Sequence, residues 1–217
     1  MWKKIHYGNM NDYEKEHLIA EVRILYSLRH ENIVRYKEHF NEKHCKTIFI
    51  VMEHCPEGDL GKKITEKKQQ QRYFNENVIW AIIMQIVKAL YECHGSDKED
   101  PDPKKRRQKV IHRDLKPANI LLGTNSTAKL ADFGISKTLT ADETHGMTSV
   151  GSPLYQSPEL IKGERYDEKT DIWSLGVIMY EMAALRPPFS GPTHFALANS
   201  IVNGEYTRIP HHFSDEM

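Results

Sequence analysis

The stretch Val110–Gly123, VIHRDLKPANILLG, constrains this chain more than any other part of its sequence. It places Asp114, Lys116 and Asn119 within six residues, between two apolar pieces that are typical of strands. Phosphoryl transfer needs positive charge near the phosphate, oxygen ligands for a metal ion and a group that orients the attacking hydroxyl. In this stretch Asp114 is suited to orient the hydroxyl and accept its proton, Lys116 to reach the phosphate, and Asn119 to offer a neutral oxygen.

A second oxygen ligand is expected nearby, and the sequence LADFGIS supplies one in Asp132. This carboxylate stands at the end of a predicted strand, before Phe133 and a flexible Gly134. Mg²⁺ is commonly held by one or two carboxylates together with phosphate oxygens. The sequence therefore predicts a Mg²⁺ site built from Asn119 and Asp132. Each motif alone is weak, because a lone Asp before Gly is usually a turn.

Charge and cysteine usage exclude several classes of function. The 217 residues contain 30 Lys plus Arg and 30 Asp plus Glu, so the formal net charge is zero. The chain as a whole is therefore not expected to be attracted electrostatically to nucleic acid or to an acidic membrane. The three cysteines form no CxxC pair, which favours reduced thiols in a cytoplasmic protein. The first ten residues show no secretory pattern, and the apolar run Val78–Leu90 is too short to cross a membrane.

The N-terminal quarter of the chain predicts one strand, one helix and two further strands. Asn11 and Asp12 are candidate helix N-caps, and Glu14 stands at capping-box spacing from Asn11. Pro56 and Gly58 then end the pattern, so a boundary between two lobes is expected near residues 53–58. The four predicted elements are Trp2–Ile5, the helix that ends near Arg29, Ile33–Phe40 and Thr47–Met52.

The remainder of the chain predicts two long apolar helices separated by short strands. The first helix covers Asn75–His94, and the second covers Asp171–Leu185, with Thr170 or Asp171 as its cap. Residues 95–109 have no apolar cluster and predict a solvated loop, with a docking patch at Lys104–Arg107 as the alternative. The run Thr138–Gly151 is rich in Ser, Thr and Gly, and we expect it to be mobile.

The order of the motifs HRDLKPAN, DFG, SPE and DIWSLG resembles a eukaryotic protein kinase. Further pieces, among them WKKIHYGNM, IFIVMEHCPEGDL and RIPHHFSDEM, are similar to the NIMA-related (NEK) family. The resemblance covers essentially the whole chain. It implies an α+β, two-lobed protein-kinase-like fold, with a partial N-lobe at residues 1–54 and a partial C-lobe at residues 55–217 that carries the catalytic and activation loops.

The resemblance also implies a role for individual residues. Lys3 matches the strand lysine that pairs with the ATP α- and β-phosphates, and Glu21 matches its ion-pair partner. Asp114 resembles the catalytic base and Lys116 the phosphate-contacting lysine, while Asn119 and Asp132 resemble the Mg²⁺ ligands. The implied adenine site comprises Met52 as gatekeeper, the hinge Glu53–Cys55 and Leu121 beneath the ring. The implied apolar stack, with Asp171 fixing its base, comprises Leu25, Tyr36, His112 and Phe133.

Two hydroxyl residues of the activation segment complete the resemblance. Thr148 stands where NEK kinases carry an activating phosphate, which could pair with Arg113. Ser152 matches the hydroxyl that contacts the catalytic Asp and Lys. The implied partners are protein substrates with Ser or Thr hydroxyls, and cytoskeletal or cell-cycle proteins. Cytoplasmic localisation, with a cytoskeletal association, is expected by analogy.

The sequence departs from the kinase pattern at both ends. Only Met1 and Trp2 precede Lys3, so the glycine-rich loop over the phosphates is absent, and a kinase fold truncated at both ends is expected. The arginine that pairs with the Glu of SPE is absent as well, which predicts that Glu159 lacks a partner. Two interpretations follow: a Ser/Thr kinase that transfers the ATP γ-phosphoryl group, or a catalytically impaired fragment or pseudokinase that works as a binding scaffold.

Overall fold

A computed structural model describes residues 1–95, 109–133, 137–139 and 153–217 of the chain, apart from the side chains of His17 and residues 137–139. The elements up to the catalytic region are β1 (Trp2–His6), α1 (Asp12–Ser27), β2 (Tyr36–Glu42), β3 (Thr47–Met52), α2 (Leu60–Gln69), α3 (Glu76–His94) and β4 (Lys109–Ile111). The elements that follow are η2 (Pro117–Asn119), β5 (Ile120–Gly123), β6 (Thr127–Leu130), β7 (Lys137–Leu139), η3 (Pro153–Tyr155), α4 (Pro158–Lys162), α5 (Lys169–Ala184) and α6 (His194–Asn203).

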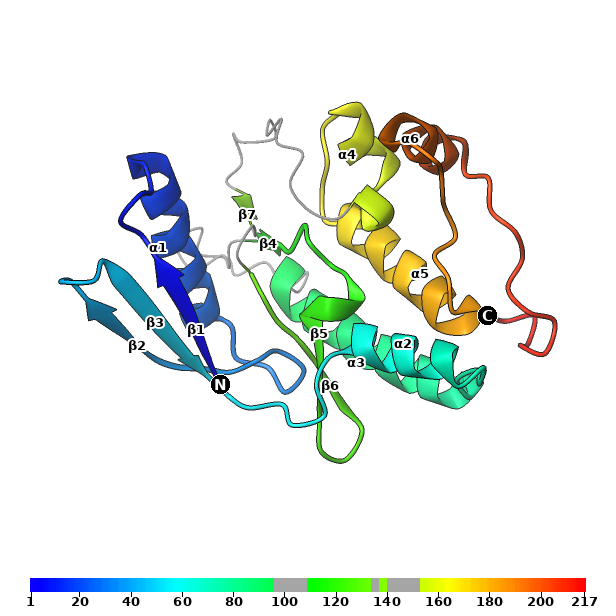
Figure 1. Cartoon of the computed structure of the whole chain (residues 1–217), viewed down its shortest axis with the longest axis horizontal. Helices are drawn as coiled ribbons and strands as arrows, with labels where there is room; N and C mark the ends of the chain where they lie inside the picture. Colours follow the sequence, from blue (N-terminus) through cyan, green and yellow to red (C-terminus); the bar gives the residue numbers. More distant parts are fainter. Residues whose placement is uncertain (96–108, 134–136, 140–152) are drawn as a thin grey trace, which may run out of the picture.

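The N-terminal elements form a three-stranded antiparallel sheet with α1 beside it, at one end of the molecule (Figure 1). The strand order is β1–β3–β2, so the central strand is TIFIVM, the most apolar of the three. Helix α1 begins with the predicted capping box. The Asn11 side chain accepts from the Glu14 amide at 2.9 Å, and the Glu14 carboxylate accepts from the Asn11 amide at 2.8 Å.

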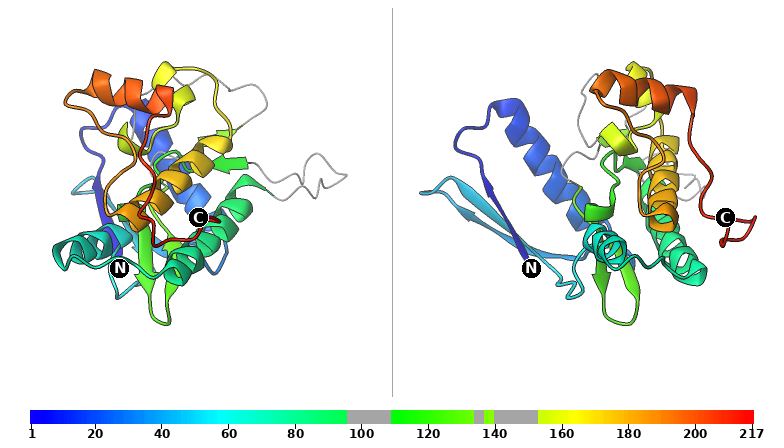
Figure 2. Two further views of the ribbon diagram at one scale, coloured as in Figure 1. Left: turned by 90° about the vertical axis from the view of Figure 1, so that its right-hand side faces the viewer. Right: turned by 45° about the vertical axis from the view of Figure 1, so that its right-hand side comes forward.

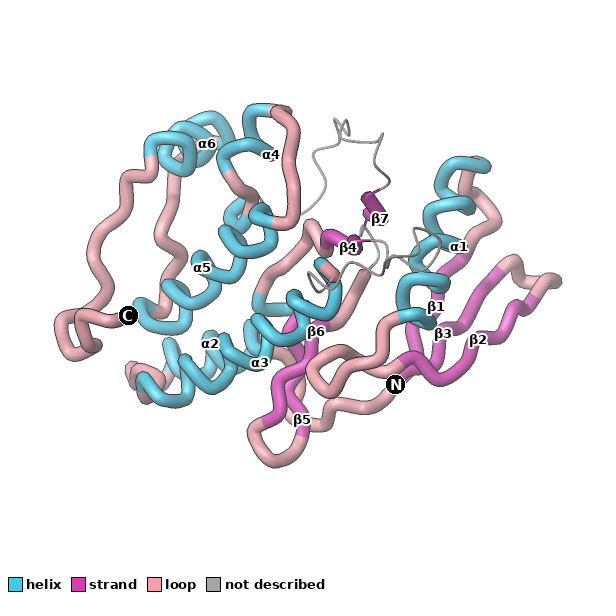
Figure 3. The backbone as a smooth tube through the Cα atoms, turned by 180° about the vertical axis from the view of Figure 1, so that it is seen from behind, coloured by secondary structure: helices cyan, strands magenta, loops and turns pink. Residues whose placement is uncertain are grey.

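The helices α2 to α6 lie on the other side of the β5–β6 hairpin (Figures 1 and 3). Helices α3 and α5 pack against each other, and the two further views in Figure 2 show them side by side. Both helices bury a long apolar face, which includes Ile79 and Ile86 on α3 and Ile178 on α5, all fully buried. These helices therefore form the core of the larger part of the molecule.

One hydrophobic cluster joins the N-terminal sheet to the helical part. The Val34 amide donates to the Leu130 carbonyl at 2.9 Å, and the Leu130 amide donates to the Asn32 carbonyl at 2.8 Å. The side chains of Ile33 and Leu130 are almost completely buried at this junction. The division into lobes at residues 1–54 and 55–217 stays a prediction, while the α+β arrangement agrees with the expected fold.

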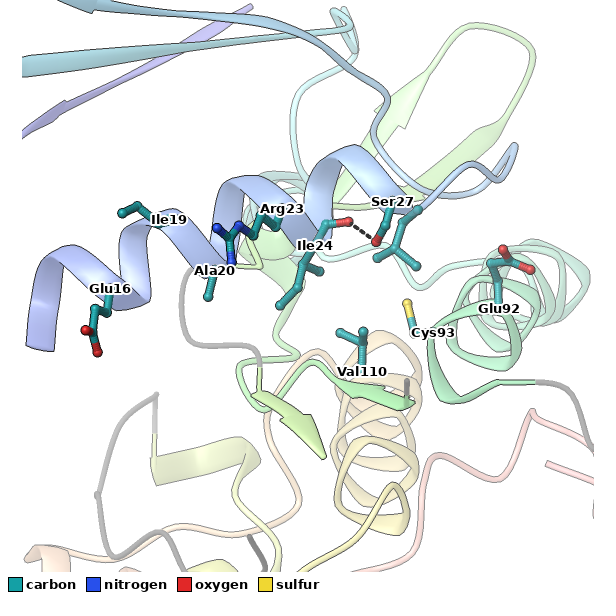
Figure 4. A pocket seen from close by; sticks show the side chains of 10 residues that line it. Glu16, Ile19, Ala20, Arg23, Ile24, Ser27, Glu92, Cys93 and Val110 are labelled. Atoms are coloured by element: carbon teal, nitrogen blue, oxygen red, sulfur yellow. Dashed lines mark hydrogen bonds between the residues drawn. The ribbon is translucent and has the colours of Figure 1, made fainter. Parts of the chain in front are cut away.

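Helix α1 is anchored mainly at its C-terminal end. Ile24, Leu25 and Leu28 are buried there. Along the flank of α1, a cavity of about 740 Å³ separates the helix from the end of α3 and from β4 (Figure 4). Cys93 and Val110 line this cavity on the opposite side from Ile24. Helix α1 therefore buries one side of its last turns against the rest of the described chain, while another side, from Glu16 to Ser27, faces this cavity.

Several predicted boundaries were wrong. The strand expected at Ile33–Phe40 begins at Tyr36 instead, because Ile33 forms an isolated bridge with Leu130. Helix α5 begins at Lys169, and the expected cap residues Thr170 and Asp171 lie buried within its first turn. Thr138, expected to begin a mobile run, lies in β7, which pairs with β4; the rest of that run and residues 96–108 lie outside the described residues.

Helices α2, α4 and α6 were not predicted. Helix α2, LGKKITEKKQ, is mostly polar and buries only Leu60 and Ile64, so its apolar pattern is too sparse to indicate a helix. Its cap was nevertheless present in the sequence, since the Asp59 carboxylate accepts from the Lys62 amide at 2.9 Å. Thr193 caps α6 in the same way, through the Ala196 amide.

Candidate active site

Lys3 lies on β1 and is fixed by strand pairing with β3. Lys3 stands opposite Ile50 in the register, and the β1–β3 pairing extends to the start of the chain. There the Met1 ammonium donates to the Met52 carbonyl at 2.8 Å, and the Met52 amide donates to the Met1 carbonyl at 2.8 Å. The strand therefore directs the Lys3 side chain from a defined position in the sheet.

The Lys3 ammonium joins two carboxylates from distant parts of the chain. Its Nζ lies 2.8 Å from Glu21 Oε1 on α1 and 2.8 Å from Asp132 Oδ1. Burial alone would lower the pKa of Lys3, but the charge of Glu21 and hydrogen bonds to Asp132 and Glu21 outweigh it, and the pKa is raised. Lys3 is therefore a cation that links the sheet, α1 and the DFG segment.

The start of the catalytic loop is held by one buried carboxylate. Asp171, fully buried at the start of α5, accepts from the His112 amide and from the Arg113 amide, both at 2.9 Å. Its Oδ2 also lies 2.8 Å from His94 Nε2. Arg113 has a φ of 66°, a left-handed conformation that is costly for a residue with a side chain. The bonds to Asp171 fix this conformation, and with it the direction of the following residue, Asp114.

Asp114, Lys116 and Asn119 are in direct contact, as their spacing predicted. Lys116 Nζ lies 2.6 Å from Asp114 Oδ2, and Asn119 Nδ2 donates to the Asp114 carbonyl at 2.8 Å and to Asp114 Oδ2 at 3.1 Å. Because the amide nitrogen of Asn119 serves Asp114, the amide oxygen is the atom suited to a metal ion. The turn η2 brings these three side chains together.

The β5–β6 hairpin brings Asp132 to the same place. Ile120 pairs with Leu130 in this hairpin, so the residues just before β5 lie beside those just after β6. The Ala131 amide donates to the Asn119 carbonyl at 2.9 Å. Asp132, the next residue, has a φ of 62° and directs its carboxylate to Lys3. A continuous set of contacts thus joins Glu21, Lys3, Asp132, Asn119 and Asp114.

The donor set fits Mg²⁺ and does not resemble a site for a transition metal. Among the described residues, no group of three His, Cys, Asp or Glu stands close enough to hold a metal ion. One carboxylate and one carboxamide oxygen remain, from Asp132 and Asn119. This is the oxygen set that Mg²⁺ takes when phosphate oxygens supply the other ligands.

The residues of the expected adenine site lie where β3 continues into the segment before α2. Met52 is buried, and the Glu53 amide donates to the Arg35 carbonyl at 2.9 Å, so that amide is already used within the protein. Burial, and secondarily the charge of Glu53, raise the pKa of the Cys55 thiol. Leu121 is half-buried and forms an isolated bridge with Asp59, close to this segment.

The expected apolar stack contains one direct ring contact. The rings of His112 and Phe133 are 4.9 Å apart, and both side chains are fully buried, as is nearly all of Leu25. His112 Nε2 also lies 3.0 Å from the Ala131 carbonyl, which orients the imidazole. Tyr36 is only partly buried and packs against the same cluster.

The expectation that Glu159 lacks a partner was wrong. Its Oε1 accepts from Thr170 Oγ1 at 2.9 Å, and the Thr170 hydroxyl is 2.5 Å from Ser157 Oγ. Glu159 is half-buried, and the Thr170 hydroxyl is a hydrogen-bond partner of its carboxylate. Thr148 and Ser152 lie outside the described residues.

Two contacts of the catalytic loop were missed in the sequence, those of His94 with Asp171 and of Tyr166 with Arg113. Arg113 Nη1 donates to the Tyr166 hydroxyl at 2.9 Å. Both contacts join residues more than fifty positions apart, and neither partner is marked by a local pattern. No signal within one sequence would have found them.

Comparison with known proteins places the chain in a family. The model described as "Protein kinase domain" matches residues 1–216. The chain belongs to the protein kinase family. Serine/threonine-protein kinase Nek2 of Homo sapiens is 41% identical over 217 residues, which is 100% of this chain and 47% of that protein. Probable serine/threonine-protein kinase nek2 of Dictyostelium discoideum is 40% identical over 100% of this chain and 50% of its own length.

The similarity extends to a fungal relative named for the cell cycle. G2-specific protein kinase nimA of Emericella nidulans is 40% identical over 230 residues, 99% of this chain and 33% of that protein. The predicted resemblance to NIMA-related kinases is therefore confirmed. The chain spans about half the length of the two Nek2 relatives or less. In the described part, no helix is both long and apolar enough to span a bilayer.

Proposed function

We propose that the chain is a serine/threonine protein kinase that transfers the γ-phosphoryl group of ATP, bound with Mg²⁺, to protein hydroxyls. The observation that carries this proposal is the contact series Glu21–Lys3–Asp132 and Asn119–Asp114 at the meeting point of the sheet and the β5–β6 hairpin. The serine/threonine kinase names of the relatives support the same activity.

Each polar group at the site then has one task. Lys3 holds the α- and β-phosphates of ATP, and Glu21 orients Lys3. Asn119 and Asp132 would hold Mg²⁺, which supplies positive charge at the phosphates. The substrate hydroxyl oxygen attacks the γ-phosphorus, and the bond from this phosphorus to the bridging oxygen breaks, so that ADP leaves with the electron pair. Asp114 accepts the hydroxyl proton, while Lys116 neutralises charge on the transferring group.

The adenine would lie against Met52, the Glu53–Cys55 hinge and Leu121. Because the Glu53 amide already donates to Arg35, we expect the Glu53 carbonyl and the Cys55 backbone to contact the base. Thr148 stays the predicted site of an activating phosphate. The name "G2-specific" of the fungal relative supports cell-cycle proteins as substrates, and cytoplasmic or cytoskeletal localisation is part of the same proposal.

The first prediction concerns Asp114. The 217-residue chain is incubated with labelled ATP, Mg²⁺ and a peptide library that contains Ser and Thr acceptors. Transfer is expected, and Asp114→Asn should lower its rate by about 10²–10⁴-fold, because a carboxamide cannot accept the proton. Asp215→Asn, which removes the same charge from an exposed pair with Arg208, should leave the rate unchanged.

The outcomes separate the kinase from the scaffold interpretation. Transfer that survives Asp114→Asn would show that the assigned mechanism is wrong. A wild-type chain that binds ATP with Mg²⁺ but transfers nothing would refute the kinase proposal and favour the binding scaffold.

A further inference from the structure

The Arg113 side chain is held by Tyr166, a residue of the segment between α4 and α5. Arg113 Nη1 lies 2.9 Å from the Tyr166 hydroxyl, and the guanidinium carbon lies 5.9 Å from the centroid of the Tyr166 ring. Tyr166 is only 8% exposed, so its hydroxyl is a fixed acceptor. Two different interactions therefore hold the same guanidinium.

The Arg113 backbone is held by Asp171, in the first turn of α5. Its amide donates to Asp171 Oδ1 at 2.9 Å while its φ stays at 66°, in the left-handed region. Such a conformation persists in a residue with a side chain only when the surroundings enforce it. Asp171 enforces it at the backbone, and Tyr166 restrains the side chain of the same residue.

The position of Arg113 determines where Asp114 points, because the two are consecutive and Arg113 has the strained backbone. Asp114 is contacted on its other side by Lys116 and Asn119. A change in the Arg113 conformation would move Asp114 relative to both. The half-buried guanidinium would then need another acceptor for its N–H groups.

We propose that Tyr166 is a positioning residue of the catalytic loop, which fixes Arg113 through its hydroxyl and ring and so keeps Asp114 aligned for phosphoryl transfer. Tyr166 acts only through Arg113 and takes no part in the chemistry. The proposal rests on the proposed function of Asp114, and it makes a physical claim about the loop that can be measured without catalysis.

The test compares Tyr166→Phe with a matched variant, Tyr180→Phe. Tyr180 is 9% exposed, and its hydroxyl donates to the Thr207 carbonyl at 2.7 Å, away from the catalytic loop. Each variant loses one buried tyrosine hydroxyl. Amide hydrogen exchange is measured by NMR at His112 and Arg113 in the 217-residue chain. Tyr166→Phe should speed exchange there by about three- to tenfold, as expected for the loss of one hydrogen bond. Tyr180→Phe should leave it unchanged.

Kinetics provide the second readout. Tyr166→Phe should lower kcat and leave KM for ATP unchanged, because the ATP contacts are made by other residues. In an Arg113→Met background, Tyr166→Phe should have no further effect on kcat, since the group it positions is gone.

Two results would overturn the proposal: unchanged exchange at His112 and Arg113 in Tyr166→Phe, or the same acceleration in Tyr180→Phe. Faster exchange with an unchanged kcat would also overturn it, because Tyr166 would then only stabilise the loop. If the wild-type chain transfers no phosphate, the proposed function fails, while the exchange measurement still decides whether Tyr166 fixes the loop.

Discussion

At the scale of single residues, Asp171 shows how a buried charge is made tolerable. A carboxylate removed from water is costly unless hydrogen bonds replace its solvation. Asp171 accepts from the His112 and Arg113 amides at the start of the catalytic loop and contacts His94 at the end of α3. The two amide hydrogen bonds that replace the solvation of Asp171 therefore also hold the start of the catalytic loop in place.

Glu181 on α5 is a half-buried carboxylate, and its charge is less well compensated. It accepts from the Tyr155 hydroxyl at 2.7 Å. Burial raises the pKa of Glu181 above its ordinary value of 4.5, although the Tyr155 hydrogen bond and the charge of Lys68 act against this shift. A raised carboxyl pKa means that the fold loses stability as the pH rises from about 4.5 through the raised value.

We expect Glu181→Gln to be at least as stable as the wild type at pH 7.5, with a difference that shrinks as the pH falls toward 4.5, because the wild-type carboxyl gains its proton as the pH falls through its raised pKa. The amide oxygen of Gln can still accept from Tyr155. Urea unfolding midpoints at the two pH values measure this. Glu164→Gln, which changes an exposed carboxylate, is the control and should show no such dependence. A loss of more than about 1 kcal/mol in Glu181→Gln at pH 7.5 would contradict the account.

At the scale of elements, the start of α3 holds the C-terminal segment. Glu76, the first residue of α3, accepts from the amide and the hydroxyl of Ser214, and His212 lies beside Tyr73. The hydrogen bonds from the Ser214 hydroxyl and amide lower the pKa of Glu76 below 4.5. A carboxylate at a helix N-terminus is also stabilised by the helix dipole.

Glu76→Ala should release the segment that contains Ser214, and trypsin should then cleave after Arg208 several-fold faster. Mass spectrometry of the digest follows this cleavage, with Glu205→Ala as the control on an exposed glutamate. Because the pKa of Glu76 is lowered, its contact is complete above pH 4.5 and is lost as the pH falls through the lowered value. A Ser214 amide resonance that does not shift on such acidification would argue against the contact, as would equal cleavage rates in the two variants.

The elements also show where sequence patterns carry information and where they do not. The capping box at Asn11 and the apolar strand Thr47–Met52 were predicted because their signals are local. Helix α2 was missed because it is stabilised by packing of two residues against distant parts of the chain, which no local period reveals. The first turn of α5 was misplaced for a related reason, since Asp171 is buried by the catalytic loop rather than exposed as a cap.

At the scale of the whole molecule, the candidate site lies where three separate parts of the chain meet. The sheet contributes Lys3, α1 contributes Glu21, and the β5–β6 hairpin with η2 contributes the remaining polar groups. The sequence predicted these residues through motifs and family resemblance. The expected pairing of Lys3 with Glu21 is present, but the sequence could not predict that Lys3 also contacts Asp132, because that geometry depends on how the sheet packs against the hairpin.

The central claim is that Asn119 and Asp132 form one metal-binding site beside a bound nucleotide, and titration calorimetry of the 217-residue chain with ATP tests it most directly. With Mg²⁺ the wild-type chain should bind ATP at least about tenfold more tightly than with EDTA, and in Asp132→Asn this ratio should fall toward one. Asp215→Asn should keep the wild-type ratio. Two results would contradict the account: a wild-type ATP affinity that is the same with Mg²⁺ as with EDTA, or an Asp132→Asn variant that keeps the wild-type ratio of these affinities.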